Sequence, residues 1–440
     1  MATLTDNPAV SAAAVEALTE RLQEPAWLAE ERRAALRTFD ATAWPTERDE
    51  DWRYTQLKRF SIDGLEPTDG PADATVGDRI AMRMRDSDAE GILVNKNGRT
   101  IETVRKLEEQ GVVFEDLNTA VREHEALVRE HLYSVVDAKS GKYHALNAAL
   151  WQNGTFVYVP AGIEVELPLG TFTTADRGGL SAGRTLIIAD ENAKVTFLDE
   201  YTSEPFDGHL FHGSVTEIVL KQGAKARYLS LQNWGRNVAH MGKMHARLAR
   251  DARLESLTVS LGGDAARVEV ESHMQGPGSE SEMLGLYFAD QGQHYNQYTL
   301  QHHEADHAFS DVLFKGALRD ASHAVYSGVI VVDEGAQKTD AYQTNRNLLL
   351  DEDSEAVSIP QLEIGANDVR CSHGSTTGPV PEDQRFYLMS RGMQPEVAEH
   401  LLVTGFLYEV MSRVTLPKAA EYVERVVQAK LGVPGVKEKL

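Results

Sequence analysis

The chain has 440 residues, an ordinary apolar fraction of 42% and one cysteine. This length suffices for two or three domains with a substantial core. A single cysteine excludes an internal disulfide framework and any zinc or iron–sulfur site built from the chain's own thiols alone. The formal net charge of −23 argues against non-specific nucleic-acid binding, which requires basic patches that neutralise phosphates.

We expect a cytoplasmic protein that does not enter a membrane. No apolar run approaches the roughly 18 residues that a membrane helix needs. The stretch MATLTDNPAV has neither the basic nor the apolar region of a secretory signal. The acidic excess fits a saline habitat or simply base composition, and net charge bears on solubility rather than on fold.

The first part of the chain is predicted to be helical and then mixed. Apolar residues recur at helical spacing within 8–60, with an interruption at Pro25. A polar linker rich in Pro and Gly follows at 66–79. Residues 91–104 indicate two short strands around an Asn-Gly turn, and mixed helix and strand continue to about Leu132.

From about Tyr143 to Val369 the helical periodicity disappears, and short β-rich runs alternate with turns. Turn signals recur at a spacing of roughly 13–16 residues, at Asp251, Asp264, Pro277, Asp290, Asp306, Asp320 and Glu334. A regular spacing over so long a stretch, without intervening helices, favours a parallel β-helix or a similar stack of strands over a sandwich.

From about Pro381 the sequence predicts helices again, with Pro near the first turn of PEDQRFYLMSRG and Gly just past its end. Helices at both ends would cover the unpaired edges of the terminal turns. We therefore divide the chain into an N-terminal helical and small α/β region (1–142), a β-helix core (143–379) and a C-terminal helical region (380–440).

Nucleotide-binding motifs are missing from the sequence. It contains neither G-x-x-x-x-G-K-[ST] nor a strand-bound G-x-G-x-x-G. Such loops cradle phosphates with backbone N–H groups. We therefore expect that the chain neither binds ATP tightly nor hydrolyses it on its own.

A histidine-rich segment, QHYNQYTLQHHEADHAF, holds His294, His302, His303 and His307 together with two carboxylates. Imidazoles and carboxylates can ligate a metal, but H-E-x-x-H is absent and solenoid turns commonly expose polar residues. We favour exposed turn residues over a metal site here. The role of His302, His303 and His307 is left open.

Other polar residues receive structural interpretations. On a strand, Glu164 and Glu166 would share a face, as a paired-carboxylate hydrolase requires, yet a solvated strand face is the favoured explanation. His144, His240 and His245 stand apart from other donors in the sequence. We interpret them as surface histidines or as histidines satisfied by local hydrogen bonds.

The single cysteine, Cys371, lies in DVRCSHGSTTG (368–378), two residues before His373. If this stretch is extended, the two side chains point to the same side, roughly 6.6 Å apart along the strand. A thiolate and an imidazole so placed can both reach one iron or one transferred sulfur atom, and the imidazole would lower the pKa of the thiol. The alternative is a small buried cysteine beside a surface histidine.

The stretch QLEIGANDVRCSHGSTTGPVPEDQRFYLMSRGM (361–393) closely resembles the C-terminal signature of the SufD branch of the SufB/SufD family, part of the SUF iron–sulfur cluster assembly machine. Residues 145–169 resemble the entry to the solenoid that both branches share, and 338–356 resemble its last coils. DEDWRYTQLKRF (49–60) resembles an N-terminal element of SufD. The resemblance therefore covers most of the chain from about Asp49 onward.

This resemblance implies a right-handed parallel β-helix between an N-terminal helical region and a C-terminal helical subdomain. It also implies a non-catalytic accessory subunit that pairs with a SufB-like paralogue through the β-helices. Each of the two subunits would bind one copy of the ATPase SufC through its C-terminal helices. The cluster would assemble on SufB or at the interface, with sulfur from a cysteine desulfurase system.

For individual residues, the resemblance places His373 and Cys371 near the SufB interface as iron or cluster ligands, with His373 the better supported. No cofactor would be bound tightly by this chain alone; a transient iron or iron–sulfur cluster would be shared with SufB. The apolar side chains expected to receive SufC are Phe386, Tyr387, Leu401, Phe406 and Tyr408. Whether Cys371 is a ligand or structural, and whether a flavin associates, stays open.

Two alternatives are kept. A SufB-type scaffold would carry the cluster itself, for example as a homodimer, but the extra cysteines expected of SufB are missing. A β-helix polysaccharide lyase would belong to a different class, usually secreted, with acidic and basic residues gathered on one sheet. That alternative explains neither the C-terminal helices nor the lone thiol.

Overall fold

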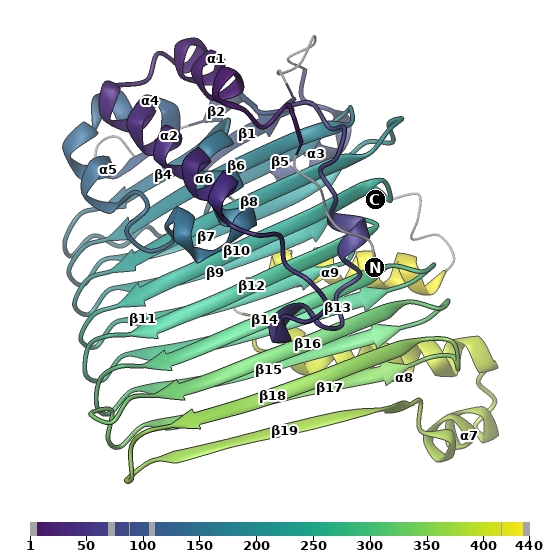
Figure 1. The fold of residues 1–440 in the computed structure, drawn as a ribbon. Helices are drawn as coiled ribbons and strands as arrows, with labels where there is room; N and C mark the ends of the chain where they lie inside the picture. Colours follow the sequence, from purple (N-terminus) through teal and green to yellow (C-terminus); the bar gives the residue numbers. More distant parts are fainter. Residues whose placement is uncertain (1–6, 69–74, 88, 105–110, 415, 434–440) are drawn as a thin grey trace.

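The computed structural model describes residues 7–68, 75–87, 89–104, 111–414 and 416–433. Two long sheets lie face to face, and the chain passes from one to the other at every half turn (Figure 1). Because neighbouring turns pair in parallel, the prediction of a mainly β protein with a parallel β-helix is confirmed. We name the nine-stranded sheet A and the ten-stranded sheet B.

Each turn contributes one strand to each sheet. Sheet A contains β4 (Asn153–Val159), β6 (Gly179–Ala189), β8 (Leu210–Leu220), β10 (Val238–Leu248), β12 (Ala265–Met274), β14 (His294–His303), β16 (His323–Val332) and β18 (Glu355–Ile364). Sheet B contains β5 (Leu169–Ala175), β7 (Lys194–Ser203), β9 (Lys225–Asn233), β11 (Arg253–Ser260), β13 (Glu280–Ala289), β15 (Phe309–Leu318), β17 (Asp340–Leu349) and β19 (Arg370–Pro379).

The pairing register explains the turn spacing in the sequence. Ala265 pairs with His294, and His294 pairs in the same way with His323 one full turn later. The chain changes sheet twice within that interval, so the spacing predicted between successive turn signals corresponds to half a turn. Several turns contain a residue with left-handed backbone, such as Asp251 at φ 57° and Asp320 at φ 58°. Asp tolerates this conformation better than most residues do.

The interior between the sheets is packed by alternate residues of each strand, mostly aliphatic and aromatic. Aromatic rings fit there because glycines of neighbouring strands leave room. A Cβ on Gly316 would lie 1.9 Å from the ring of Tyr287, and a Cβ on Gly285 would lie 2.2 Å from the ring of Phe314. These glycines are therefore required by packing rather than by a turn.

The N-terminal region extends both sheets. β1 (Gly91–Lys96) pairs in parallel with β5, β2 (Arg99–Val104) pairs antiparallel with β1, and β3 (Val113–Asp116) pairs antiparallel with β4. The predicted hairpin at 91–104 is confirmed, with positive φ at both Asn97 and Gly98. Of the predicted linker at 66–79, residues 69–74 lie outside the described part of the chain.

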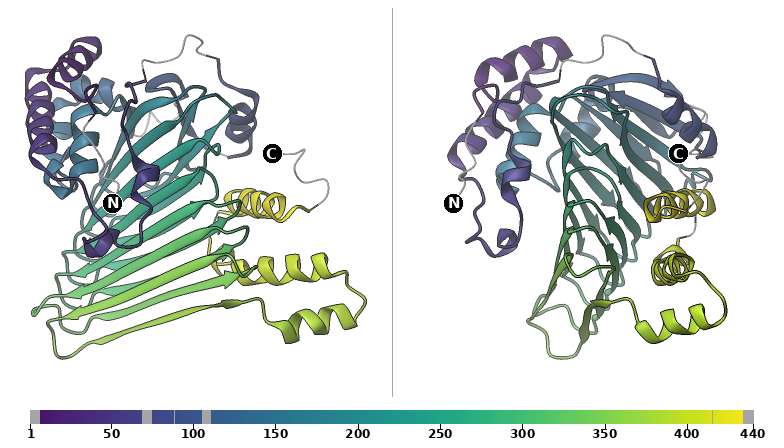
Figure 2. Two further views of the ribbon diagram at one scale, coloured as in Figure 1. Left: turned by 45° about the vertical axis from the view of Figure 1, so that its right-hand side comes forward. Right: turned by 90° about the vertical axis from the view of Figure 1, so that its right-hand side faces the viewer.

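The N-terminal helices lie on the outer face of sheet A (Figure 2). They are α1 (Ala12–Leu22), α2 (Ala26–Ala41), α4 (Leu117–Glu123), α5 (Glu125–His131), the short η4 (Ala138–Ser140) and α6 (Lys142–Leu150). Tyr143 and Leu146 of α6 pack against Phe211 and Met241 of the sheet. The helical pattern predicted around Pro25 is confirmed, because α1 ends before this proline and α2 begins after it.

After α2, the chain up to residue 68 runs along the outer face of sheet A through η1 (Glu50–Trp52) and η2 (Leu57–Phe60) (Figure 2); α3 (Asp78–Asp86) follows in the sequence. The backbone N–H of Gln56 donates to His294 Nε2 at 3.1 Å, and Arg59 pairs with Asp264 at 2.6 Å. At the far end, Gln361 of β18 donates to Glu50 at 3.1 Å. Residues 49–60 therefore reach the last turn of the solenoid.

The C-terminal helices α7 (Glu382–Ser390), α8 (Pro395–Met411) and α9 (Pro417–Leu431) do not cover the end of the solenoid, which corrects the prediction. α8 and α9 turn back and lie against the outer face of sheet B (Figure 2). Their buried residues pack on leucines of that face: Leu229, Leu257, Leu284 and Leu313. No described helix covers the last turn, β18 and β19, so this end is open as far as the described residues extend.

The successive solenoid strands β4 to β19 run from Asn153 to Pro379, and the domain limits 142/143 and 379/380 stay a prediction. No described helix has the length and apolar character to cross a membrane.

Candidate functional site

Cys371 and His373 lie on β19, the terminal strand of sheet B. In the register with β17, Cys371 pairs with Ala341 and His373 pairs with Gln343, and both of these β17 residues are buried in the interior. Because side chains alternate along a strand, Cys371 and His373 share the face that continues the interior of the solenoid. The geometry agrees with the predicted shared face; the role of both residues stays a prediction.

The environments of the two side chains differ. Cys371 is half-buried among apolar residues of the last turns, including Ile330, Val332 and Ala341. His373 is exposed. Burial, and then the carboxylate of Asp340, raises the pKa of the Cys371 thiol. In this chain alone the shift is opposite to the lowering of the thiol pKa expected from the neighbouring imidazole.

Across the open end, Ser375 of β19 donates to Ser358 of β18 at 2.8 Å. Within the described part of the chain, neither Cys371 nor His373 belongs to a set of three His, Cys, Asp or Glu donors close enough to hold one ion. Within the described residues, these two side chains therefore supply at most two protein ligands to one ion.

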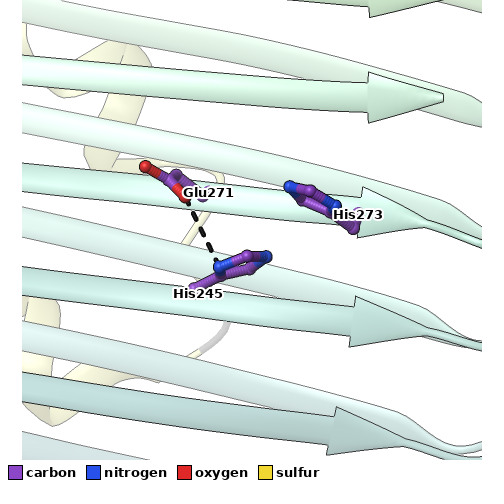
Figure 3. A group of neighbouring side chains, drawn as sticks. All are labelled: His245, Glu271 and His273. Atoms are coloured by element: carbon purple, nitrogen blue, oxygen red, sulfur yellow. Dashed lines mark ion pairs between the residues drawn. The ribbon is translucent and has the colours of Figure 1, made fainter. Parts of the chain in front are cut away.

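A second group of donors lies on the outer face of sheet A and was not predicted as a group. We call His245, Glu271, His273, His302 and Glu304 the histidine–carboxylate cluster. His245 comes from β10, Glu271 and His273 come from β12, and their side chains lie next to each other (Figure 3). His245 Nδ1 lies 3.4 Å from Glu271 Oε2.

The histidine predictions are corrected here. His245 is not isolated, because the ring of His273 on the next turn lies 4.4 Å away, centroid to centroid. The neighbours His302 and His303 point to opposite faces: His302 joins the cluster, whereas His303 is buried inside and contacts Ser310 Oγ at 2.8 Å. His307 is exposed in the following turn.

A signal for this cluster is present in the sequence. His302 follows His273 by one solenoid turn, and Glu271 follows His245 by one turn. Parallel pairing in register stacks such residues on the same face, and strand alternation puts Glu271 and His273 on that face together. Recognising the cluster from sequence therefore requires the full repeat length and not only the turn spacing.

Lysine and glutamate side chains adjoin the cluster. Lys243 Nζ lies 2.5 Å from Glu271 and 3.3 Å from Glu269, with all three largely buried. Burial alone would lower the pKa of Lys243, but the two carboxylates outweigh it and raise the pKa. His144, also thought isolated, lies 3.4 Å from Glu269. His240 is buried beside His212, away from this face.

The remaining predicted residues are placed as follows. Glu164 and Glu166 lie exposed in the connection between β4 and β5, not on a strand, and Glu164 pairs with Lys194 at 2.6 Å. Phe386, Tyr387, Leu401 and Tyr408 are exposed on α7 and α8. Phe406 lies on α8 but is partly buried against sheet B, with Lys315 Nζ 4.5 Å from its ring centre.

The exposed apolar residues on α7 and α8 are numerous: Phe386, Tyr387, Met389, Val397, Leu401 and Tyr408, of which Phe386 is 73% exposed. We call them the α7–α8 patch. The opposite side of α8, with Val403, Leu407 and Val410, is buried. A helix that is apolar on both sides indicates a second surface that can be covered by another protein.

The paired sheets and the helices at both ends define the class of protein: a parallel β-helix flanked by N- and C-terminal helices. Comparisons identify the family. The SufBD protein N-terminal region matches residues 16–170, and the SUF system FeS cluster assembly SufBD core domain matches residues 172–406. The chain therefore belongs to the SufB/SufD family of iron–sulfur cluster assembly proteins.

Relatives agree with this assignment. An iron–sulfur cluster assembly SufBD family protein of Staphylococcus epidermidis is 30% identical over 318 residues, covering 72% of this chain and 68% of the relative. The iron–sulfur cluster assembly protein SufB of Bacillus subtilis is 30% identical over 316 residues, with the same two coverages. The resemblance found in the sequence is confirmed for the family, whereas these matches do not separate the SufB from the SufD branch.

Proposed function

We propose that this chain is a SufD-type accessory subunit that helps iron enter a nascent iron–sulfur cluster and is not itself an enzyme. The observation that carries the proposal is the open last turn, where Cys371 and His373 share the interior-facing side of the terminal strand. An imidazole and a thiol suit iron, but the pair is incomplete within the described chain. The missing ligands would come from the subunit that covers this end.

The expected covering subunit is a SufB-like paralogue with a β-helix of its own. β18 and β19 present unpaired backbone groups at the end of both sheets, and such edges readily pair with strands of another chain. A second β-helix would continue both sheets at once. A transient iron or cluster would then sit at the junction, with His373 as a ligand and Cys371 as a ligand or packed neighbour.

The α7–α8 patch is the proposed docking surface for a SufC-like ATPase. It combines aromatic and aliphatic side chains over two consecutive helices, as expected for the centre of a protein interface. The sequence has no phosphate-binding loop, so ATP hydrolysis would belong to this partner. We expect the complex in the cytoplasm, supplied with sulfur by a cysteine desulfurase system.

The SufB-type scaffold is the alternative, favoured by the relative that is named SufB. Such a chain would hold a cluster by itself or as a homodimer. One cysteine per chain argues against this, because iron–sulfur clusters are usually held by several thiolates. The polysaccharide lyase alternative gains no support from the family.

The proposal is tested by purifying the tagged full-length chain from its own cells and identifying the proteins that accompany it. Wild type should carry a SufB-like and a SufC-like protein. Ser375→Arg, which places a long cation at the open end, should release the SufB-like protein alone, whereas Glu191→Arg in the exposed turn between β6 and β7 should release neither. Recovery of only this chain, with a cluster bound, would support the SufB-type alternative instead.

The docking surface needs point variants, because removing α8 and α9 would expose the leucines of sheet B that they cover. Leu401→Asp combined with Tyr408→Asp changes the exposed side of α8 only. This variant should lose the ATPase and keep the SufB-like protein. Glu399→Ala on the same helix serves as the matched control and should keep both. Retention of the ATPase by the double variant would move the docking surface elsewhere.

A further inference from the structure

Three histidines from consecutive turns stack on the outer face of sheet A. The ring centroids of His245 and His273 are 4.4 Å apart, and those of His273 and His302 are 4.9 Å apart. Glu304, directly after β14, turns toward the last two: its Oε1 lies 2.9 Å from His273 Nδ1 and 3.7 Å from His302 Nδ1. Two imidazoles and one carboxylate thus direct donor atoms to a common point.

We propose that His273, His302 and Glu304 form a binding site for a divalent transition-metal ion. Donors about 2.1 Å from one metal lie about 3.0 Å apart at a right angle and about 3.6 Å apart at 120°. The two spacings from Glu304 Oε1 are close to these values. Two histidines and one carboxylate leave coordination positions open and are a donor set used for Fe²⁺ and Zn²⁺.

The groups around these three residues support ligation. Histidine ligands commonly use one ring nitrogen for the metal and donate from the other to a carboxylate. His302 has this arrangement, since its Nε2 lies 3.0 Å from Asp333 Oδ1 while its Nδ1 faces Glu304. The second oxygen of Glu304 accepts from Gln275 Nε2 at 3.2 Å. The side chains of His302 and Glu304 are both about one-quarter exposed, so an ion can enter from solvent.

His245 adds an independent observation. It is nine-tenths buried, and its Nε2 has no hydrogen-bond partner in the part of the chain that the structure describes. It places a further nitrogen donor beside His273. The nearby Glu271 is already held by Lys243 at 2.5 Å, and Arg247 of the same strand as His245 donates away from the cluster to Ser134 at 2.8 Å. We therefore assign the ion to Glu304 rather than to Glu271.

This site is separate from the proposed function at the last turn. The triad lies on the outer face of sheet A, whereas His373 lies on the interior side of sheet B at the open end. The structure carries the inference of metal binding by itself. Only the identification of the ion as Fe²⁺ rests on the proposed function, because cluster assembly would bring iron to this chain.

The test uses the chelator-stripped full-length chain and Co²⁺ as a spectroscopic probe, followed by Fe²⁺ under anaerobic calorimetry. One ion per chain is expected, with Co²⁺ absorption typical of nitrogen and oxygen ligands. Glu304→Gln and His302→Ala should each weaken binding at least about tenfold, and Asp333→Asn about tenfold. Exposed His307→Ala is the matched histidine control and should bind as wild type does. His373→Ala is measured alongside it to show whether the ion sits at the last turn instead.

The outcomes separate this site from the proposed function. Far-ultraviolet circular dichroism without metal establishes that each variant is folded, and a metal-dependent rise of the melting temperature gives a second readout. Binding that persists within twofold in Glu304→Gln and His302→Ala, or no binding by wild type, overturns the metal site. Loss of binding in His373→Ala would place the ion at the last turn and also overturn it. Neither result depends on partner pull-down.

Discussion

Arg184 of β6 and Glu217 of β8 form a fully buried ion pair, with both side chains 0% exposed and 2.6 Å between Nη2 and Oε1. Glu217 also accepts three backbone hydrogen bonds, from Tyr133, Val135 and Val136 at 2.9–3.0 Å. The pair thus fastens the connection between α5 and α6 to the outer face of sheet A. We predict that its two members contribute unequally to stability.

The magnitudes follow from what each substitution leaves behind. Removing one partner of a buried pair costs about 3–5 kcal/mol. Glu217→Met leaves a buried guanidinium and, in addition, three backbone N–H groups, each costing about 1–3 kcal/mol when unpaired. Arg184→Met removes the donor to Asn147 Oδ1 and to the Val136 carbonyl, but unpaired acceptors are better tolerated than unpaired N–H groups. The carboxylate left behind is still stabilised by three N–H groups, so the cost should stay near about 3 kcal/mol. Glu217→Met should therefore cost at least about 2 kcal/mol more.

Urea denaturation followed by tryptophan fluorescence measures this difference, and Trp151 is a local reporter because its Nε1 donates to Tyr133 Oη at 2.8 Å. The melting temperature is a less sensitive measure. With an unfolding entropy of about 2.1 cal/mol/K per residue over 440 residues, a loss of about 3 kcal/mol lowers the melting temperature by only about 3 °C. Lys194→Met, which breaks the exposed pair with Glu164, is the control and should cost under about 1 kcal/mol. An equal or larger cost for Arg184→Met would refute the reasoning.

Three further predictions follow from particular residues. Burial raises the pKa of Asp199 to about 6, so the folded state binds the carboxyl proton more tightly than the unfolded state does. The free energy of unfolding should therefore fall by about 3 kcal/mol as pH rises from about 4 to 6. Asp199→Asn should remove this pH-dependent part of the stability, as measured by urea denaturation across that pH range. Gly316→Ala should destabilise by about 1–3 kcal/mol or more in urea denaturation because of Tyr287, whereas Gly335→Ala, with open space around it, should not. His373→Ala should leave folding and partner binding intact but sharply reduce cluster formation in iron-limited cells; normal assembly there would make the Cys-Ser-His-Gly stretch structural.

The sequence predicts the solenoid well because its turns carry residues that tolerate left-handed backbone, and these recur at half-turn spacing. The position of the C-terminal helices was missed for a physical reason. Leu229, Leu257, Leu284 and Leu313 pair with one another in succession, so one leucine per turn marks an outer face that must be covered. Strand alternation alone does not distinguish the inner from the outer apolar face.

Prediction of the candidate sites from the sequence is limited in the same way. Cys371 and His373 are two residues apart, so local alternation suffices to place them on one face. The histidine–carboxylate cluster joins residues on three turns, and its members become neighbours only through the pairing register. His302 and His303 look equivalent in the sequence, yet alternation sends one into the cluster and the other into the core. Predicting a site that is formed by residues on several turns therefore requires the strand pairing register as well as the local sequence motif.

The composition of the open end bears on whether it works alone. In β16, the interior-facing Tyr326, Ile330 and Val332 are buried, whereas the corresponding side of β19 carries the small or polar Ser375 and Thr377 beside His373. This lowers the cost of leaving the interior side of β19 in water, whereas β18 keeps the apolar Leu362 and Ile364 on its interior side. Yet β19 has one charged residue, Arg370 at its start, and lacks the inward-pointing lysines and bulges that usually keep a sheet edge from pairing. The polar interior side and unprotected backbone edge of β19 therefore differ from β18, whose edge contains Pro360, a residue without an N–H to donate, and the two terminal strands are not equally open to pairing.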